Sequence, residues 1–345
     1  MSNELTRRPD TDPTPVYRYR DGLYAQDLLI VGVAWLDLFS WIAQNPSLQS
    51  DVEKKFDFAG RPADVMLTLF VAMGLLVRRS GRYYVTQIAR EHLCSDSPWF
   101  LGPYYSSLKD RPVCRDLYNV LRTGKPANWG SEPNKGDWHK AMEENAFAVQ
   151  FTAAMDCRGV FLAQALATKI NLRKGNRLLD IAGGSGIYAC SLCAHFRDLK
   201  ATVFEKPPID GVAKRAISAR GYTDRVSVTA GDMLFGALPL GFDVHLFSNV
   251  LHDWDVTTVM QLLEKSFNAL TPGGLLLIHD AHLNENKAGP IHVAEYSVML
   301  MHSTNGRCYS VREMKGYLRE VGFAGSRFLP TAAARSVIIA RKATK

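Results

Sequence analysis

The segment SNVLHDWD, residues 248–255, places a histidine and two aspartates directly after the apolar stretch FDVHLFSNVL. Such a run predicts a buried strand that opens into a loop. His252 is then either an ordinary loop residue or a general base, because a histidine pKa of about 6.5 allows proton uptake at neutral pH. Asp280 ends the next predicted strand, so its carboxylate can hold the other ring nitrogen of His252. Asp253 is the alternative partner for that nitrogen.

A second candidate site lies in LLDIAGGSGIYA, residues 178–189, which reads as a strand, a glycine-rich turn and a helix. Gly183, Gly184 and Gly186 allow the backbone to turn sharply and to approach a ligand closely. Glu205 follows about twenty residues later at the end of the next strand, where a carboxylate can accept both hydroxyls of a ribose. The spacing predicts a ligand that contains a nucleoside, either a dinucleotide or S-adenosylmethionine.

Three features favour S-adenosylmethionine over a dinucleotide. Asp180 directly precedes the glycines, where it can bind an ammonium group and would repel a pyrophosphate. Asp232 and Met233 end the third strand, and they can accept the adenine amino group and cover the ring with a soft apolar face. No pair of residues suggests hydride transfer. We expect no metal site either, because His279 and His282 are three apart on a predicted strand and so point to opposite faces.

Four segments are expected in the 345-residue chain. Residues 1–20 are rich in proline and charge and predict a flexible tail. Residues 21–105 predict helices over 24–43, 47–56 and 61–76 and a hairpin at Ser80-Gly81, which is a winged-helix pattern. Residues 106–170 predict a helical connector with a loop at 125–138. Residues 171–345 alternate short strands with helices, which predicts an α/β fold with a parallel sheet.

The composition favours a cytoplasmic protein that binds neither nucleic acid nor a membrane. The net charge of +7 comes from scattered basic residues, and the predicted helix 61–76 is apolar, which favours pairing of protein chains over DNA binding. The six cysteines show no disulfide pattern, and Cys190 and Cys193 fall inside a predicted helix, where they are expected to be buried. There is no signal peptide, and the longest apolar run, residues 28–36, is too short to cross a bilayer.

The chain resembles the S-adenosylmethionine-dependent small-molecule O-methyltransferases that carry an N-terminal dimerisation domain. The resemblance covers almost the whole chain, and its motifs are RLLDIAGGSG, GDMLFGALPLGFDVHLFSNVLHDWD, ALTPGGLLLIHDAHLNEN, EYSVMLMHSTNGRCYSVREMKGYLREVGF, LDLFSWIA, GLLVRRSGRYYVTQIAREHL and LRTGKP. It implies a Rossmann-like methyltransferase fold whose last strand is antiparallel. It also implies a homodimer in which the N-terminal domain closes part of the partner's substrate pocket.

By the same resemblance, His252 is the catalytic base and Asp280 its supporting acid. Cofactor contacts are implied at Gly183, Glu205, Asp232, Met233 and Ser248. The chain departs from the family pattern at five of its positions: Ala182 replaces a glycine, Glu205 an aspartate, Ser248 a lysine, Asp280 a glutamate, and Cys308 the glutamate of plant members.

The expected reaction is methyl transfer from S-adenosylmethionine to a hydroxyl of a small aromatic or polycyclic molecule. Met155, Met299 and His302 are candidates to line the acceptor pocket, although core packing explains the two methionines equally well. Methylation of carbon or nitrogen remains an alternative. A winged-helix regulator that senses S-adenosylmethionine is a further alternative, against which the apolar helix 61–76 argues.

Overall fold

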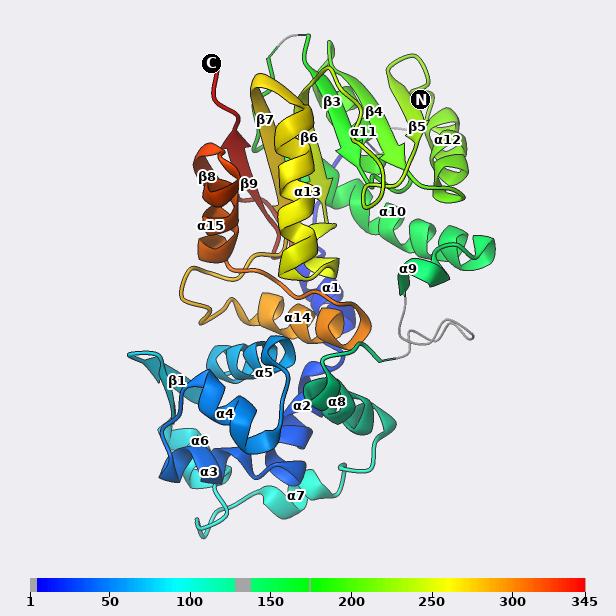
Figure 1. Ribbon diagram of the computed structural model, residues 1–345. Coiled ribbons are helices and arrows are strands. Elements are labelled where there is room, and N and C mark those ends of the chain that lie inside the picture. Colours follow the sequence, from blue (N-terminus) through cyan, green and yellow to red (C-terminus); the bar gives the residue numbers. More distant parts are fainter. Residues whose placement is uncertain (1–4, 128–137, 174, 345) are drawn as a thin grey trace. The chain divides into compact units, whose positions relative to one another are not determined.

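The computed structural model describes residues 5–127, 138–173 and 175–344 (Figure 1). The chain forms two compact units. The first comprises Met1–Thr14, Trp138–His282 and Val311–Lys345, and the second comprises Pro15–Asp137 and Leu283–Ser310. Most of the predicted loop at 125–138, and residues 1–4 of the predicted tail, lie outside the described residues.

The first unit is built on a sheet whose seven described strands have the order β5-β4-β3-β6-β7-β9-β8. The strands are β3 (Arg177–Ile181), β4 (Lys200–Glu205), β5 (Val226–Ala230), β6 (Phe242–Ser248), β7 (Leu270–Asp280), β8 (Ala324–Pro330) and β9 (Ser336–Arg341). Neighbours from β5 through β7 are parallel, whereas β9 is antiparallel to both β7 and β8. The expected α/β, Rossmann-like fold with an antiparallel last strand is confirmed.

Helices alternate with these strands, as the sequence predicted. They are α9 (Trp138–Ala141), α10 (Asn145–Ala167), α11 (Ile187–His195), α12 (Ile209–Ala219), the 3-10 turn η3 (Leu251–Asp253), α13 (Val256–Ala269) and α15 (Val311–Val321). The chain order of the strands reverses between β3 and β6, and ligands of open α/β sheets bind at the carboxyl ends of strands at such a point. A ligand site is therefore expected at the loops after β3 and β6.

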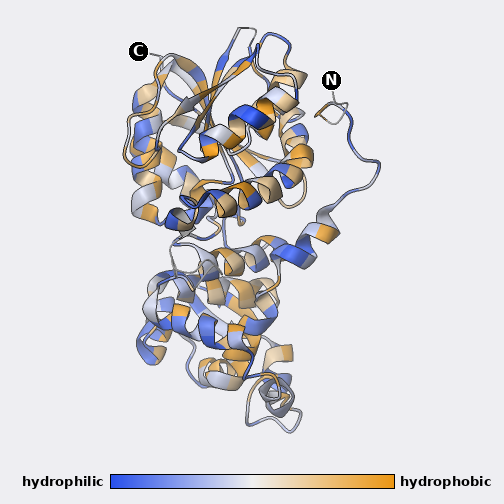
Figure 2. Cartoon of the chain, turned by 90° about the vertical axis from the view of Figure 1, so that its right-hand side faces the viewer, coloured by the Kyte–Doolittle hydropathy of each residue, from blue (hydrophilic) through white to orange (hydrophobic). Residues whose placement is uncertain are grey.

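The second unit is mainly helical and contains a two-stranded hairpin. Its elements are α1 (Thr14–Asp21), α2 (Ala25–Ile30), the π-helical turn η2 (Val31–Trp35), α3 (Leu38–Gln44), α4 (Gln49–Phe56), α5 (Gly60–Ala72), β1 (Leu76–Arg79), β2 (Arg82–Val85), α6 (Gln87–His92), α7 (Gly102–Ser106), α8 (Pro112–Thr123) and α14 (Ile291–Ser303). Figure 2 shows hydrophobic and hydrophilic residues interspersed along these helices, as amphipathic packing requires. The hairpin predicted at Ser80-Gly81 is confirmed, and both residues have the positive φ of a tight hairpin turn.

Two predictions for this unit need correction. The continuous helix expected over 24–43 is broken, because Asp37 adopts a left-handed backbone conformation between η2 and α3. The expected helix 61–76 ends at Ala72, and its apolar face is buried within the unit, where α5 packs against α14. Its composition therefore reflects core packing and does not by itself indicate a pairing surface.

The buried α2 and α3 also account for the long apolar stretch near the N-terminus. No single helix in the described part of the chain is long and apolar enough to cross a membrane. Only when Ala25–Trp35 and Leu38–Gln44 are taken together, with a bend of 63° between them, do they reach that length and apolar composition. Leu28, Leu38 and Ile42 of these helices are fully buried. Cys190 and Cys193 are buried in α11 as predicted, and burial raises the pKa of each thiol to about 12.

Candidate functional site

The glycine loop between β3 and α11 is built so that its backbone can pass close to a ligand. A Cβ added at Gly183 would lie 2.6 Å from Oδ2 of Asp180, so no side chain fits there without displacing that carboxylate. Gly184 and Gly186 have φ values of +57° and +76°, in the left-handed region that favours glycine. Ala182 also has a positive φ of 54°, which explains why a glycine is common there in the family it resembles.

Asp180 is completely buried beneath this loop. Neither of its carboxylate oxygens makes a hydrogen bond to the described residues. Burial, together with the nearby charge of Glu205, raises the pKa of Asp180 to about 7. A buried acid left in this state is completed by a cationic or hydrogen-bond-donating ligand, which is what an amino-acid moiety would supply.

Glu205 ends β4 and links this strand to the glycine loop that follows β3. Its Oε2 accepts a hydrogen bond from the amide of Gly184 at 3.0 Å, and its Oε1 accepts one from the amide of Lys206 at 2.9 Å. Burial raises the pKa of Glu205 to about 7. Each oxygen of a carboxylate can accept a second hydrogen bond, so both ribose hydroxyls can still be bound.

Asp232 and Met233 lie in a closed turn that follows β5. The Oδ1 of Asp232 accepts a hydrogen bond from the amide of Leu234 at 2.7 Å, and its carbonyl accepts one from the amide of Gly236 at 2.8 Å. Lys265 of α13 donates to the carbonyl of Met233 at 2.9 Å. The turn thus has a fixed backbone conformation, and sequence reasoning did not single out Lys265.

Ser248 ends β6 and precedes a strained residue that sequence reasoning also missed. Asn249 has a φ of 53°, and its Nδ2 donates to the Tyr188 hydroxyl at 3.1 Å and to Ser248 Oγ at 3.3 Å. Its Oδ1 accepts from Nε of the buried Arg335 at 3.2 Å. Asparagine tolerates the left-handed conformation better than most residues, and this was the one signal available in the sequence.

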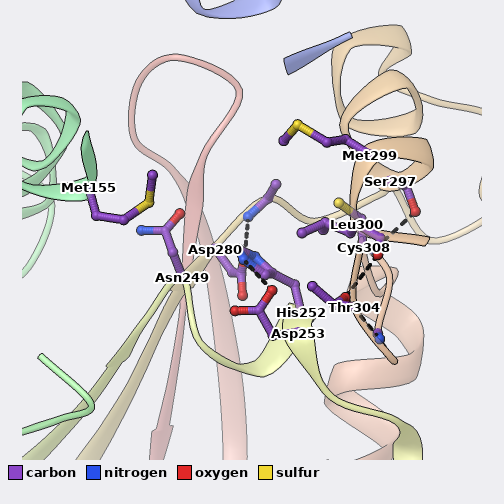
Figure 3. A network of polar contacts seen from close by, with 12 residues as sticks. Met155, Asn249, His252, Asp253, Asp280, Ser297, Met299, Leu300, Thr304 and Cys308 are labelled. Atoms are coloured by element: carbon purple, nitrogen blue, oxygen red, sulfur yellow. Dashed lines mark hydrogen bonds and ion pairs between the residues drawn. The ribbon is translucent and has the colours of Figure 1, made fainter. Parts of the chain in front are cut away.

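His252 lies in η3, immediately beyond β6, and is buried between two carboxylates (Figure 3). Its Nδ1 donates a short hydrogen bond to Oδ1 of Asp280, the last residue of β7. Oδ1 of Asp253 lies 3.7 Å from Nε2 on the other side of the ring. The structure therefore brings together the predicted histidine and its predicted supporting acid, and assigns Asp253 to the opposite ring nitrogen.

The charges around His252 set its proton affinity. Burial alone would lower the pKa of His252, but the carboxylates of Asp280 and Asp253 and the hydrogen bond to Asp280 raise it above its ordinary value. Burial also raises the pKa of Asp253 to about 6. The pKa of Asp280 falls to about 2, because the charge and hydrogen bond of His252 outweigh its burial. The positive charge of Arg335 opposes protonation of His252.

The three predicted acceptor-pocket residues belong to different units. Met155 lies on α10 of the first unit, where its sulfur accepts a contact from Arg158 at 3.2 Å. Met299 and His302 lie on α14 of the second unit. His302 is buried against the ring of Tyr24, at 4.5 Å between ring centres, and burial lowers its pKa.

His279 and His282 are separate, singly bonded histidines. His279 Nε2 pairs with the Thr331 hydroxyl at 2.9 Å, and His282 Nδ1 pairs with the Ser336 hydroxyl at 2.8 Å. Burial lowers the pKa of His279 to about 3 and that of His282 to about 4, so both are neutral. Within the described ranges, no group of three or more histidines, cysteines or acids is placed to hold a metal ion.

Comparison with known proteins places this geometry in a family. The model of the O-methyltransferase domain matches residues 115–324. A 3-hydroxy-5-methyl-1-naphthoate 3-O-methyltransferase of Streptomyces sahachiroi is 28% identical over 312 residues, which are 90% of this chain and 89% of that protein. An O-methyltransferase family 2 protein from Planctomyces limnophilus, solved in complex with apigenin, is 30% identical with a TM-score of 0.89 and covers 98% of both chains.

Human N-acetylserotonin methyltransferase, solved in complex with S-adenosylmethionine, shares the fold with a TM-score of 0.62 at 23% identity, over 98% of this chain and 100% of that one. The orphaned carboxylate of Asp180, the glycine loop and Glu205 fit this cofactor. The chain therefore belongs to the O-methyltransferase domain family and is an S-adenosylmethionine-dependent methyltransferase.

Proposed function

We propose that this methyltransferase methylates a hydroxyl of a small aromatic or polycyclic molecule, with His252 as the general base. The observation that carries the proposal is the buried hydrogen bond between His252 and Asp280 at the ligand-binding edge of the sheet. The naphthoate specificity in the name of the Streptomyces sahachiroi relative, and the apigenin bound to the Planctomyces limnophilus protein, support a phenolic acceptor.

Each residue at the strand ends would hold a different part of the cofactor. Asp180 pairs with its ammonium group, Glu205 accepts its ribose hydroxyls, and Asp232 accepts the adenine amino group while Met233 covers the ring. Gly183, Gly184 and Gly186 leave room for close approach of the backbone, and Ser248 lines the same edge from β6. When bound, S-adenosylmethionine supplies an electrophilic methyl group on a sulfonium.

Proton removal is the step that the protein must assist. A phenol has a pKa of about 10, so only about one molecule in a thousand is ionised at neutral pH. With Nδ1 donating to Asp280, the lone pair of His252 lies on Nε2, which would take the proton from the acceptor hydroxyl as that oxygen is methylated. Asp280 and Asp253 then stabilise the imidazolium from both sides. Such assistance contributes typically about 10²–10⁴-fold.

The second unit is proposed to mediate homodimerisation. Large apolar side chains are exposed on it, among them Tyr19 on α1 and Trp99 and Tyr104 near α7. Met299 and His302 on α14, with Met155 on α10, are the proposed acceptor contacts. Sedimentation velocity on the purified chain checks the dimer, and a monomer at micromolar concentration would contradict it.

The function is tested with labelled S-adenosylmethionine and a panel of phenols, naphthoates, anthracyclines, indoles and porphyrins. We expect a methyl ether as product, identified by NMR, and a loss of at least about 100-fold in kcat for His252→Ala, relieved at high pH as the acceptor ionises. His92→Ala, at an exposed histidine of α6, is the matched control and should leave kcat unchanged. A product methylated at carbon or nitrogen, or an unaffected His252→Ala variant, would refute the oxygen-transfer proposal.

A further inference from the structure

None of the side chains in the turn after β5 is fully buried. This turn runs from Asp232 to Gly236 and is closed internally by the two hydrogen bonds to Asp232 already described. The side chain of Phe235, at the tip of the turn, is 85% exposed. A turn without buried side chains at its tip is free to open unless polar contacts hold it to the rest of the unit.

Lys265 of α13 makes three such contacts. Lys265 Nζ donates to the carbonyls of Met233 at 2.9 Å, Leu234 at 2.6 Å and Gly236 at 3.0 Å. An ammonium group can donate three hydrogen bonds and accept none, so these three carbonyls use its full hydrogen-bonding capacity. Hydrogen bonds that involve a charged partner are about twice as strong as neutral ones. Lys265 therefore fixes the directions of three carbonyls in a four-residue stretch.

The position of Lys265 on α13 connects this turn to the base. Asp255 caps the first turn of α13 by accepting from the amide of Thr258 at 2.8 Å, and the loop with His252 immediately precedes that cap. The same rigid helix thus begins beside His252 and presents Lys265 to the turn with Asp232. A displaced turn changes where the adenine lies relative to the reacting methyl group.

We propose that Lys265 is a positioning residue for the cofactor: through the carbonyls of Met233, Leu234 and Gly236 it holds Asp232 and Met233 in the orientation that binds adenine. The inference rests on the proposed cofactor roles of Asp232 and Met233. Lys265 itself touches neither the cofactor nor the acceptor in this account, so its loss should weaken cofactor binding more than it slows the bound enzyme.

The structure offers a matched control for the test. Lys342 Nζ also donates to carbonyls at an end of α13, those of Phe267 and Leu270. Lys342 directly follows β9. Its amide donates to the carbonyl of Gly274, near the start of β7, so this lysine lies at the amino edge of the parallel strands. Lys265→Met and Lys342→Met thus remove the same kind of contact from two different places, the turn after β5 and the junction between α13 and β7.

The measurement is the Kd of S-adenosylhomocysteine by calorimetry, with steady-state kinetics beside it. For Lys265→Met we expect Kd and the KM for S-adenosylmethionine to rise by about tenfold or more, with kcat at saturation within about twofold. For Lys342→Met we expect a lower Tm with an unchanged Kd. Lys265→Gln keeps two of the three donors and should give an intermediate Kd, which provides the comparison where Lys265→Met does not fold.

A double-mutant cycle separates this inference from the cofactor assignment. Lys265→Met and Asp232→Asn should be less than additive in the free energy of binding, whereas Lys265→Met and Glu205→Gln should be additive. If Asp232→Asn weakens binding and Lys265→Met does not, the positioning role is wrong. If neither changes the Kd, the adenine assignment itself is wrong, and the role of Lys265 is refuted with it.

Discussion

Replacing Asp280 by asparagine is expected to move the acid limb of the pH–rate profile to lower pH while lowering the plateau. In the wild type, the pKa of His252 is raised because Asp280 and Asp253 outweigh the effect of burial. Only neutral His252 accepts a proton, so kcat/KM is lost as the pH falls through that raised pKa. Asparagine keeps the size of the side chain but removes its charge, so burial then dominates and the pKa of His252 drops.

The size of the effect follows from the contact that is lost. A hydrogen bond to a charged group contributes about 1.5–3 kcal/mol, which is about one to two pKa units. The acid limb of Asp280→Asn should therefore shift down by about one to two pH units. Because the same contact stabilises the imidazolium formed during methyl transfer, kcat/KM on the plateau should fall by about 10–100-fold.

The assay is kcat/KM for a phenolic acceptor from pH 5.5 to 9.5, with the concentration of S-adenosylmethionine held at saturation at each pH. Asp253→Asn is the matched control, since Asp253 lies 3.7 Å from Nε2 and is partly protonated near pH 6. Its acid limb should shift less than that of Asp280→Asn. An acid limb that stays in place in Asp280→Asn, or moves to higher pH, refutes the assignment of His252 as a base held by Asp280.

Three further predictions concern the cofactor site and the fold. Because the pKa values of Asp180 and Glu205 are raised to about 7, the contribution of these two carboxyls to the stability of the free protein should fall as the pH rises from about 4 to 7, and calorimetry should show cofactor binding weakening below pH 7 with release of protons. Gly183→Ala should weaken S-adenosylhomocysteine binding by at least about tenfold, because its Cβ overlaps Asp180, whereas Gly211→Ala, whose Cβ meets only an ordinary contact at 3.6 Å, should bind normally. Asp255→Ala removes the cap of α13 and should lower the free energy of unfolding in urea by about 1 kcal/mol, and an unchanged value would show that the cap contributes nothing.

The strand ends were predictable because parallel strands impose a common geometry. Three apolar runs of the first unit carry an acid at or next to their last residue, and the carboxyl ends of parallel strands meet at one edge. Asp180, Glu205 and Asp280 were expected at strand ends, and the structure places each of them, buried, at or one residue before the end of β3, β4 and β7. Their chemical roles remain proposals, because strand register determines position and not reactivity.

Residues that act from across the unit left no such local signal. Arg335 lies in the β8–β9 connection and reaches Asn249 after β6, and 86 residues separate them in the chain. Lys265 reads in the sequence as one of many exposed helix lysines, and only the fold shows that its three donors meet one turn. Periodicity reports which face of an element is buried, but it cannot report which distant element a polar side chain meets.

The division of the chain into units shows the same limit at a larger scale. The sequence predicted one continuous domain over 171–345, since strands and helices alternate throughout it. Residues 283–310 instead join the second unit, where Arg18 forms an ion pair with Glu295 at 2.8 Å and Lys287 forms one with Asp64 at 2.9 Å. The side chain of Glu295 is only 4% exposed, so loss of Arg18 would leave a largely desolvated carboxylate without this ion pair, whereas Asp64 is also paired with Arg307 at 3.3 Å. The helix with Met299 and His302 is thus held by charges from sequence-distant helices of its own unit.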